Sequence, residues 1–282
     1  MSAYDISLLS VVGINVILAV SLNLISGFCG QISLEHGAFY GAGAYAAALT
    51  AIATHNLVLA LVAGAIVGSL LGIIVGFASL RVRSDFLAVT TIGVNFLFTG
   101  FVRKQSWLGG EMGISGIPAS GLGATGNMVL IIACALVTIA LSLYINRSWM
   151  GFTFRAVSED EDAATTLAVN VASYKLAAFG IGTALAGLAG GLYTYFTQFI
   201  TADAFDFVVS VMLLAMVVIG GIGSTWGVAV AAVVLTLLPE AIRFLNDYRL
   251  LVFGGLLVLM IRVAPGGMAG LFKQLVWRSA KP

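Results

Sequence analysis

Long apolar segments recur along the whole chain and are separated by short polar connections. This pattern limits the fold more than any other feature. A helix that crosses the hydrocarbon core of a bilayer, about 30 Å thick, needs roughly 17–25 mostly apolar residues. Such spans are expected at residues 6–26, 37–54, 57–80, 84–102, 127–146, 174–198, 207–222, 226–245 and 249–264. The first six are clear, whereas the last three are shorter and are interrupted by Pro239, Arg243, Arg249 and Arg262.

The composition points to the same class of protein. Only 9% of the 282 residues are charged and 60% are hydrophobic, whereas a soluble domain carries about 25% charged residues. A soluble exterior needs such groups, so a soluble enzyme, a nucleic-acid-binding protein and a disordered chain are excluded. The net charge of +1 also provides no basic field for nucleic acid. Barrel-type alternation is absent, which predicts an all-α polytopic membrane protein with about 8–9 transmembrane helices.

Basic residues predict the orientation, because Lys and Arg are enriched in short cytoplasmic loops. With nine spans and an external N-terminus, nine basic residues lie inside and four lie outside. The inside residues are Arg81, Arg83, Arg147, Arg155, Lys175, Arg262, Lys273, Arg278 and Lys281, and the outside residues are Arg103, Lys104, Arg243 and Arg249. We therefore expect an external N-terminus and a cytoplasmic C-terminus.

Two of the expected spans carry small residues at four-residue steps. They are Gly64, Gly68, Gly72 and Gly76 in the third span, and Thr183, Gly187 and Gly191 in the sixth. Residues four apart lie on one face of a helix, so each set forms a stripe that lets another helix backbone come close. Both stripes are interpreted as packing surfaces without a direct part in function.

The longest polar stretch on the predicted cytoplasmic side, residues 146–173, joins the fifth and sixth spans. Within it Ser158 is a suitable N-cap, and the acidic residues Glu159–Asp162 would lie in the first helical turn, where the helix dipole favours negative charge. Residues 163–169 continue with helix-forming types. The sequence thus predicts one short surface helix, which is either a solvated connector or a docking element for a soluble partner.

Polar side chains at membrane depth are costly and mark candidate parts of a solute pathway. The candidates are Asn23, Gln31, Ser33, Glu35, His36, Tyr40, Thr91 and Asn95. Residues 26–36 form either a broken, re-entrant segment or a short cytoplasmic turn. In both cases Glu35 is expected at the inner mouth of the pathway, where water relieves the roughly 2.5–3.5 kcal/mol that its charge costs at a helix centre. Hydrogen bonding between helices is the alternative role of the uncharged polar residues.

No catalytic or metal-binding arrangement is visible in the sequence. Cys29 and Cys134 lie in separate apolar segments, so neither a disulfide nor a metal site is expected. A Gly-x-x-x-x-Gly-Lys-Ser/Thr phosphate loop is also absent. The chain is therefore expected to be no enzyme and to hold no cofactor. Energy for transport has to come from another chain or from an ion gradient.

Four motifs follow one another along the chain. They are NLISGFCGQIS with HGAFYGAGAY (Asn23–Ser33 and His36–Tyr45), GISGIP (Gly113–Pro118), RAVSEDE with YKLAAF (Arg155–Glu161 and Tyr174–Phe179), and MVVIGGIGS (Met216–Ser224). Together they resemble the LivM-type permeases, of the LivH/LivM family, that belong to bacterial ATP-binding-cassette (ABC) importers for branched-chain amino acids. The motifs cover nearly the whole chain.

The resemblance implies a single transmembrane permease domain over residues 1–282 in the bacterial inner membrane. It implies import of branched-chain or related hydrophobic amino acids by alternating access, with ATP hydrolysed on partner subunits. The implied partners are a second homologous permease, two ATP-binding subunits and a periplasmic solute-binding protein, within the lipid bilayer. The residues implied in coupling to the ATPase are Arg155, Ser158, Glu159, Asp160, Glu161, Asp162, Ala163, Ala164 and Asn170.

Three residues depart from the family pattern. Glu35 stands where glycine is usual, and Met212 stands where glutamate is common. These two departures leave the identity of the transported solute undecided. Ala168 replaces a glycine that would ease a left-handed C-cap, and we expect the surface helix to be longer by a few residues. The alternatives are a permease for urea or short amides, and an ion-coupled secondary transporter acting alone with Glu35 as its proton or cation site. A structural membrane anchor explains the many glycine and polar positions poorly.

Overall fold

The computed structural model describes residues 2–81, 84–241, 249–264 and 266–270. All long elements among these residues are helices. They are α1 (Ala3–Leu22), the π-helix η1 (Asn23–Phe28), α2 (His36–Thr54), α3 (Leu57–Ser79), α4 (Ser84–Lys104), η2 (Ser106–Leu108), α5 (Gly123–Arg147), α6 (Trp149–Glu159), α7 (Glu161–Thr166), α8 (Val171–Thr197), η3 (Ala202–Phe205), α9 (Phe207–Gly220), α10 (Thr225–Ala241) and α11 (Arg249–Val263). The predicted all-α polytopic fold is confirmed.

Each of the nine expected spans corresponds to one helix, namely α1 to α5 and α8 to α11. Within the part of the chain that the structure describes, six helical segments are long and apolar enough to cross a membrane. They are Ala3–Phe28, Leu57–Ser79, Phe86–Lys104, Gly123–Arg147, Val171–Thr197 and Ala202–Gly220. The shorter apolar helices Thr225–Glu240 and Leu251–Met260 are the two last expected spans, where the sequence contains the interrupting proline and arginines.

Helix α2 differs from the expectation that the first six spans are clear, because it is not among the strongly apolar segments. Its first turns and most of its remaining residues are buried inside the protein. A helix that faces other helices rather than lipid needs small residues more than strongly apolar ones. Burial therefore explains the glycine- and alanine-rich composition of α2.

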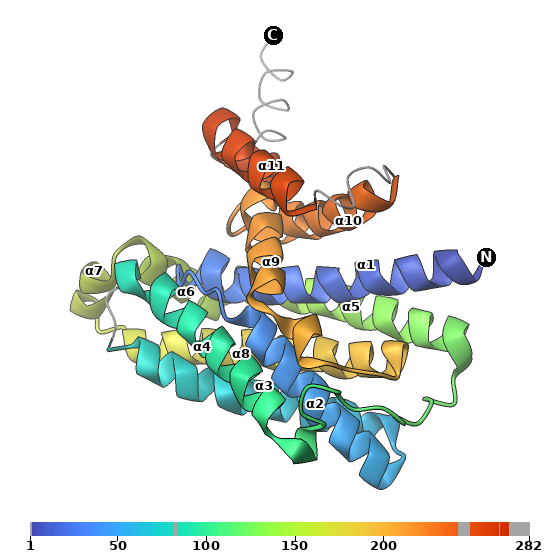
Figure 1. Cartoon of the computed structure of the whole chain (residues 1–282). Helices are drawn as coiled ribbons and strands as arrows, with labels where there is room; N and C mark the ends of the chain where they lie inside the picture. Colours follow the sequence, from blue (N-terminus) through green and yellow to red (C-terminus); the bar gives the residue numbers. More distant parts are fainter. Residues whose placement is uncertain (1, 82–83, 242–248, 265, 271–282) are drawn as a thin grey trace.

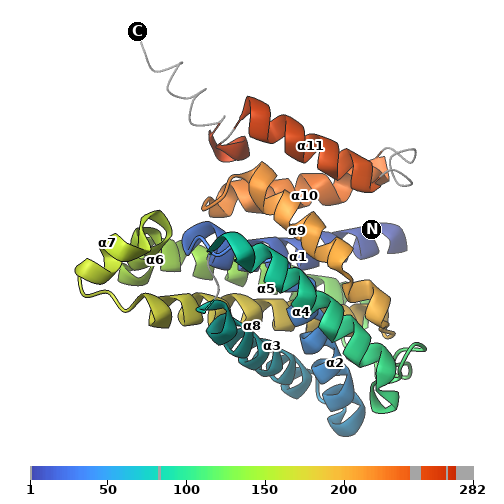
Figure 2. The same cartoon turned by 60° about the vertical axis from the view of Figure 1, so that its left-hand side comes forward.

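The N-terminus lies at one end of the bundle, and α6 and α7 lie at the other (Figures 1 and 2). The α6–α7 end carries Arg81, Arg147, Arg155 and Lys175, which are all in the predicted inside set. Arg103 and Lys104, from the outside set, lie in the last turn of α4, which points away from the α6–α7 end. The separation agrees with the predicted orientation, which stays a prediction. Arg83, Arg243 and the C-terminal basic residues lie outside the described residues.

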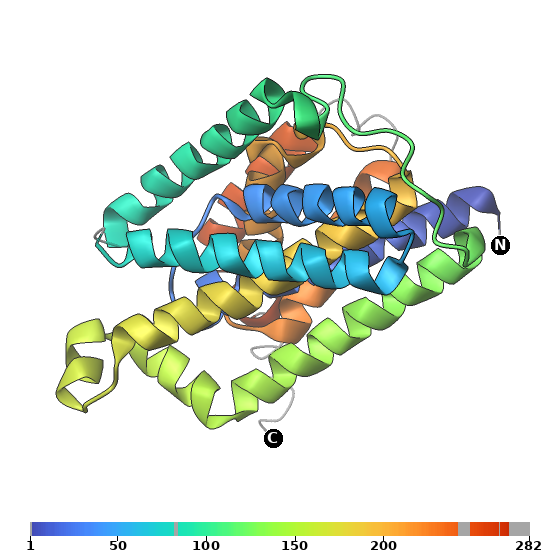
Figure 3. The ribbon, with the colours of Figure 1, turned by 90° about the horizontal axis from the view of Figure 1, so that it is seen from below.

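Helices α2, α3 and α8 pack side by side (Figure 3), and glycines permit their close approach. A Cβ atom on Gly43 of α2 would collide with the backbone of Gly187 in α8. A Cβ atom on Gly64 of α3 would lie 2.9 Å from the carbonyl oxygens of both Gly43 and Gly187. The three backbones therefore meet at one point, where no side chain larger than hydrogen fits.

The glycine stripe of α3 continues along α8, one turn at a time. A Cβ atom on Gly68 would lie 2.6 Å from the carbonyl oxygen of Thr183, and one on Gly72 would overlap the Thr183 side chain. A Cβ atom on Gly76 would lie 3.0 Å from the ring of Phe179. The two predicted stripes thus face each other, and their predicted role in helix packing is confirmed.

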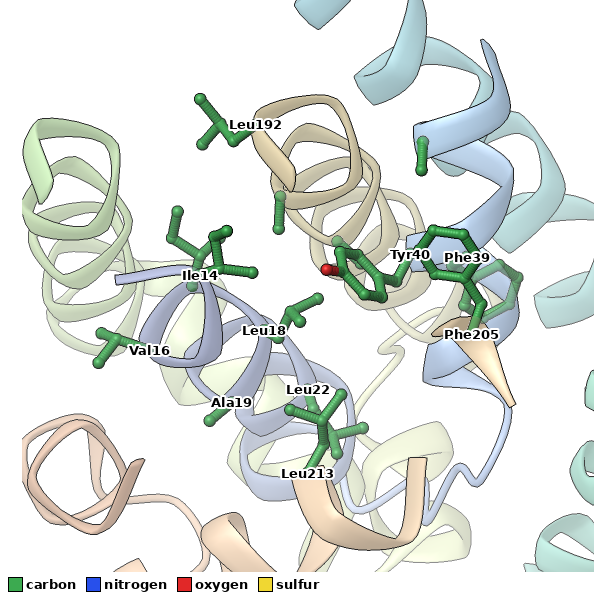
Figure 4. Close-up of a cluster of buried hydrophobic side chains, with 14 of the residues drawn as sticks. Ile14, Val16, Leu18, Ala19, Leu22, Phe39, Tyr40, Leu192, Phe205 and Leu213 are labelled. Atoms are coloured by element: carbon green, nitrogen blue, oxygen red, sulfur yellow. The ribbon is translucent and has the colours of Figure 1, made fainter. Parts of the chain in front are cut away.

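Larger apolar side chains fill the space between α1, α2, α8 and the η3–α9 segment. Figure 4 shows Leu18 and Leu22 of α1 directed toward Tyr40 of α2 and Leu213 of α9. Tyr40 packs edge-on against Phe205, with ring centroids 4.9 Å apart. This core fixes α1 and α9 against the glycine-packed helices, and the functional site described below lies between the same elements.

The glycine contacts predict a position-dependent effect of an added methyl group. Gly187→Ala would overlap the carbonyl oxygen of Gly64 and should lower stability by about 1–3 kcal/mol, the usual cost of overpacking. Gly93→Ala in α4 is the matched control, because a Cβ there meets no atom within 4 Å. The thermal unfolding midpoint of the purified protein in detergent should fall for Gly187→Ala only. Equal midpoints for the two variants would contradict the packing described here.

The orientation can be tested by labelling single cysteines in a background without Cys29 and Cys134. Met112 is 86% exposed on the α4–α5 connection, and Leu167 is 76% exposed after α7. A membrane-impermeant maleimide should label Leu167→Cys only from the cytoplasm and Met112→Cys only from outside. Labelling of both positions from the same face would show that the span assignment between them is wrong.

Candidate functional site

Helix α1 passes directly into the π-helix η1, and residues 29–35 then run irregularly to α2. A π-helical turn within a span is frequent at functional sites. Figure 3 shows α2 beginning well short of the end at which α3 finishes. Within the irregular link, Gln31, Ser33 and Glu35 are buried, while Gly30 and Ile32 are exposed. Of the two interpretations of this region, the structure shows a broken segment inside the bundle rather than a solvated turn.

The link and the start of α2 form hydrogen bonds to three other helices. The bonds run from Leu34 N–H to Thr91 Oγ1 of α4 (3.1 Å), between His36 Nε2 and Ser21 Oγ of α1 (2.7 Å), and from Gly37 N–H to Ser210 Oγ of α9 (2.8 Å). Side-chain hydroxyl groups thus bind the backbone that the broken helix leaves without helical partners. One short segment consequently links three helices through single hydrogen bonds.

The residues around this link form one polar cluster, which we define as Ser21, Ser33, Glu35, His36, Thr91, Asn95 and Ser210. In Glu35, Oε1 accepts a hydrogen bond from Ser33 Oγ at 3.2 Å, and Oε2 has no partner. In Asn95, Nδ2 donates to Ser210 Oγ at 3.2 Å, and Oδ1 has no partner. His36 Nδ1 is also unpartnered. Buried polar atoms are normally hydrogen-bonded, so three exceptions in one place are unusual.

Glu35 does not lie where the sequence led us to expect it. Its side chain is 0% exposed, so the expectation of a water-filled inner mouth around it is wrong. The cause is the depth at which α2 begins, which draws the preceding residue between α1, α4 and α9. Whether Glu35 and its neighbours lie on the solute path stays a prediction.

Asn23 connects two of the motifs that are far apart in the sequence. Its Oδ1 accepts a hydrogen bond from Gly223 N–H at 2.9 Å. Gly27, one turn further on, is so close to the same loop that a Cβ atom on it would lie 2.7 Å from the Gly223 nitrogen. The first and last motifs therefore meet at the π-helix.

The other two pathway candidates take different positions. Gln31 acts through its backbone, because its N–H donates to the Ile25 carbonyl oxygen at 3.2 Å and its carbonyl oxygen accepts from Ser26. Tyr40 lies in the apolar core beside Tyr193 and Phe205. Neither belongs to the polar cluster defined above.

Two members of the cluster, Ser21 and Ser210, were not expected from the sequence. Serines inside apolar helices often bond only to their own backbone, as Ser21 Oγ also does with the Leu18 carbonyl oxygen at 2.8 Å. Nothing in the sequence separates such a serine from one that links helices. Their role depends on which helices are neighbours.

The polar stretch 146–173 forms two helices, so the prediction of one helix starting at Ser158 is wrong. Ser158 lies in the last turn of α6, where its Oγ donates to the Arg155 carbonyl oxygen at 2.9 Å. Asp160 is the N-cap of α7, and its Oδ1 accepts from Ala163 N–H at 2.9 Å. Only Glu161 and Asp162 lie in the first turn of α7. The residues of α6 before Ser158 bury an apolar face against η1. This packing keeps the chain helical through Ser158, the residue at which a new helix was expected to begin.

The expected lengthening of the surface helix at Ala168 is also wrong. Helix α7 ends at Thr166, and Ala168 adopts a left-handed conformation with φ of 61°. This conformation costs a non-glycine residue about 1–2 kcal/mol. The chain reverses here to enter α8, which Asn170 caps by accepting a hydrogen bond from Ser173 N–H at 3.2 Å. Asn170 thus has a structural role in placing α8.

Helix α6 packs directly on the broken segment. Phe154 and Val157 share a small apolar core with Leu24 and Phe28 of η1. Gly30 has a φ of 71°, and a Cβ atom on it would lie 2.9 Å from Ser158 Cβ. The surface segment 146–173 and the link that carries Glu35 are therefore in contact.

Two polar contacts hold the segment 146–173 on the bundle. Lys175 Nζ lies 2.5 Å from Glu161 Oε1, and Arg155 Nη2 donates to the carbonyl and side-chain oxygens of Asn146 at 2.7 and 2.8 Å. Within α7, Ala164 is buried against the bundle, whereas Ala163 is exposed. The outward face also carries Glu159, Asp160, Asp162 and the 76% exposed Leu167. This face is mixed acidic and apolar.

A cavity of about 690 Å³ lies between α2, α3 and α4, and only apolar atoms line it. None of the predicted pathway residues is part of its lining. Among the described residues, no group of three or more His, Cys, Asp or Glu side chains is arranged to hold a metal ion. The polar cluster, rather than the cavity, is therefore the candidate site.

Comparison with known proteins decides the family. Residues 6–261 match the family model described as the permease component of branched-chain amino acid transport systems. The chain belongs to this family. It is a multi-pass membrane permease subunit, and the resemblance noted in its motifs is confirmed. No solved structure matches the chain.

Three relatives are named as permease proteins of high-affinity branched-chain amino acid transport systems. The chain is 32% identical to LivM of Escherichia coli (strain K12), over 90% of this chain and 67% of LivM. It is 26% identical to BraD of Pseudomonas aeruginosa, over 90% of this chain and 91% of BraD. It is also 32% identical to LivH of Escherichia coli (strain K12), over 52% of this chain and 48% of LivH. The chain thus spans about two-thirds of the length of LivM.

The contact between Gly30 and Ser158 predicts a transport defect that backbone strain alone does not cause. Gly30→Ala adds a Cβ against Ser158, whereas Gly116→Ala, at a φ of 76°, adds one in open space. Both variants should lose about 1–2 kcal/mol of stability from the left-handed backbone. Only Gly30→Ala should reduce leucine uptake per permease in the membrane. Equal uptake by the two variants would show that this contact does not matter for transport.

Proposed function

We propose that this chain is a permease subunit of an ATP-driven importer for branched-chain or related hydrophobic amino acids. The observation that carries the proposal is the contact between the segment 146–173 and the broken helix that holds the polar cluster. The printed names of LivM, LivH and BraD support the solute class. We place the protein in the bacterial inner membrane, with its N-terminus in the periplasm and α6 and α7 in the cytoplasm.

The contacts provide a mechanical route from a docked ATPase to the interior of the bundle. An ATP-binding subunit that holds α7 also moves α6, because the two helices are joined at Asp160. Helix α6 then displaces η1 and Gly30, against which it packs. Beyond Gly30, the link and the first residues of α2 bind α1, α4 and α9 by single hydrogen bonds. A small shift of the link therefore exchanges bonds to three helices at once, as alternating access requires.

The partners follow from what the chain lacks and from its relatives. ATP has to be bound by separate subunits, because the sequence has no phosphate loop. The chain matches both LivM and LivH of one organism, which supports a second homologous permease beside this one. A pair of permeases would engage two ATP-binding subunits. A periplasmic solute-binding protein would supply the affinity that a transient site in the permease does not need.

One alternative keeps a specific observation in its favour. A secondary transporter driven by protons or cations would use the unpartnered carboxylate oxygen of Glu35 as its ion site. The urea and short-amide alternative has no comparable observation, and the three relatives named above are described as branched-chain amino acid permeases. Leucine uptake into proteoliposomes by the complete complex should need ATP inside and no ion gradient. Uptake that follows an ion gradient without ATP would overturn the importer assignment.

Charge reversal on the outward face of the segment tests the docking. Glu159 and Asp162 are exposed, and neither is the α7 cap nor the partner of Lys175. In the double variant Glu159→Lys/Asp162→Lys, Asp162→Lys should oppose the α7 dipole by about 0.3–1 kcal/mol at its first turn, and both changes should repel a basic ATPase surface. Leucine uptake and solute-stimulated ATP hydrolysis should fall by about tenfold or more.

The control places the same kind of charge change elsewhere. Glu111→Lys lies on the exposed α4–α5 connection, which we place in the periplasm, and should leave ATP hydrolysis by the complex within about twofold of wild type. Membrane abundance should be normal in both variants, because no span is changed. Undiminished uptake by the double variant would mean that this segment is only a connector.

A further inference from the structure

The polar cluster contains several buried polar atoms that have no hydrogen-bond partner. Glu35, His36 and Asn95 are each 0% exposed, and each has one side-chain atom without a hydrogen-bond partner. Burial of this kind is costly unless another group completes the bonds. The cluster is closed to solvent, so the missing partners have to arrive when the link moves.

Two of the unpartnered atoms, Glu35 Oε2 and Asn95 Oδ1, are hydrogen-bond acceptors. The residues on either side of Glu35 bond to the stretch of α4 and α9 that contains Asn95 and its partner Ser210. Leu34 N–H bonds to Thr91, one turn before Asn95 on α4. Gly37 N–H bonds to the same Ser210 oxygen that accepts from Asn95 Nδ2. Glu35 therefore lies between two residues that both contact this stretch of α4 and α9.

No cation of the described chain neutralises Glu35. The ion pairs among the described residues join Arg103 to Asp203 and Lys175 to Glu161. Lys175 is a buried cation, and the second pair places it beside α7, where it holds that helix. A carboxylate and an amide oxygen without donors complement a group with several donors, no acceptor and a positive charge. A primary ammonium group has these properties, and its bonds to a carboxylate are charge-assisted.

We propose that the polar cluster binds the ammonium group of the transported solute, with Glu35 and Asn95 as its acceptors. The proposal rests on the proposed function and deepens it by naming the residues that bind the ammonium group of the solute. Ser33 orients the carboxylate through Oε1 and leaves Oε2 for the solute. The site forms when α6 displaces the link, so the coupling segment controls access to it.

Glu35→Gln keeps the shape of the side chain and removes its charge. In proteoliposomes that contain the complete complex, leucine uptake should fall by about tenfold, whereas Glu35→Asp should keep most of it. The thermal midpoint of Glu35→Gln should equal or exceed that of wild type, because an unpaired buried charge is lost. A purely structural role predicts the opposite, a lower midpoint. Unchanged uptake, or a fall in uptake together with the midpoint, would overturn the proposal.

A binding measurement separates this proposal from the proposed function. The purified complex is heated in the presence of leucine, isoamylamine, which has an ammonium group but no carboxylate, or isocaproate, which has a carboxylate but no ammonium group. Leucine and isoamylamine should raise the thermal midpoint of the wild-type permease and should not raise that of Glu35→Gln. An equal effect of isocaproate, no effect of isoamylamine, or an unchanged response of Glu35→Gln would overturn the ammonium site. A proton on Glu35 instead of a solute predicts the second of these results. Failure of wild-type leucine uptake would refute only the importer assignment.

Discussion

The close approach of α2, α3 and α8 is the constraint on which the rest of the structure depends. Lipid removes the hydrophobic drive between helices, so their association relies on backbone-level packing. Gly43, Gly64 and Gly187 meet where no Cβ fits, and this contact holds α2 in the middle of the protein. Because α2 is central, it begins inside the bundle, and the preceding residues have to cross the interior without helical hydrogen bonds.

The position of α2 explains both the polar cluster and its connection to the surface. A broken segment at this depth needs side-chain partners, and Thr91 and Ser210 bind its backbone N–H groups. The same segment touches α6 at Gly30. The segment that leaves polar atoms unpartnered in the interior is therefore also the segment that α6 contacts.

Much of the fold could be predicted because apolar length and small-residue spacing are local properties of the chain. The helical spans and the stripe at Gly64–Gly76 follow from such patterns, and the structure confirms them. The predicted N-cap at Ser158 and the helix extension at Ala168 fail because contacts with η1 and the turn into α8 override local preference. The polar candidates were identified, but the exposure of Glu35 was not, because it depends on where α2 begins.

The sequence by itself determined the membrane class, the permease family and which residues are polar at membrane depth. These conclusions need only composition, period and ordered motifs. The tertiary structure alone decided that Glu35 is buried, that Ser21 and Ser210 join its surroundings, and that Ser158 touches Gly30. These contacts join residues distant in the chain, and no local pattern encodes them. They arise because glycine packing sets the depth of α2, and that depth decides which helices its first residues meet.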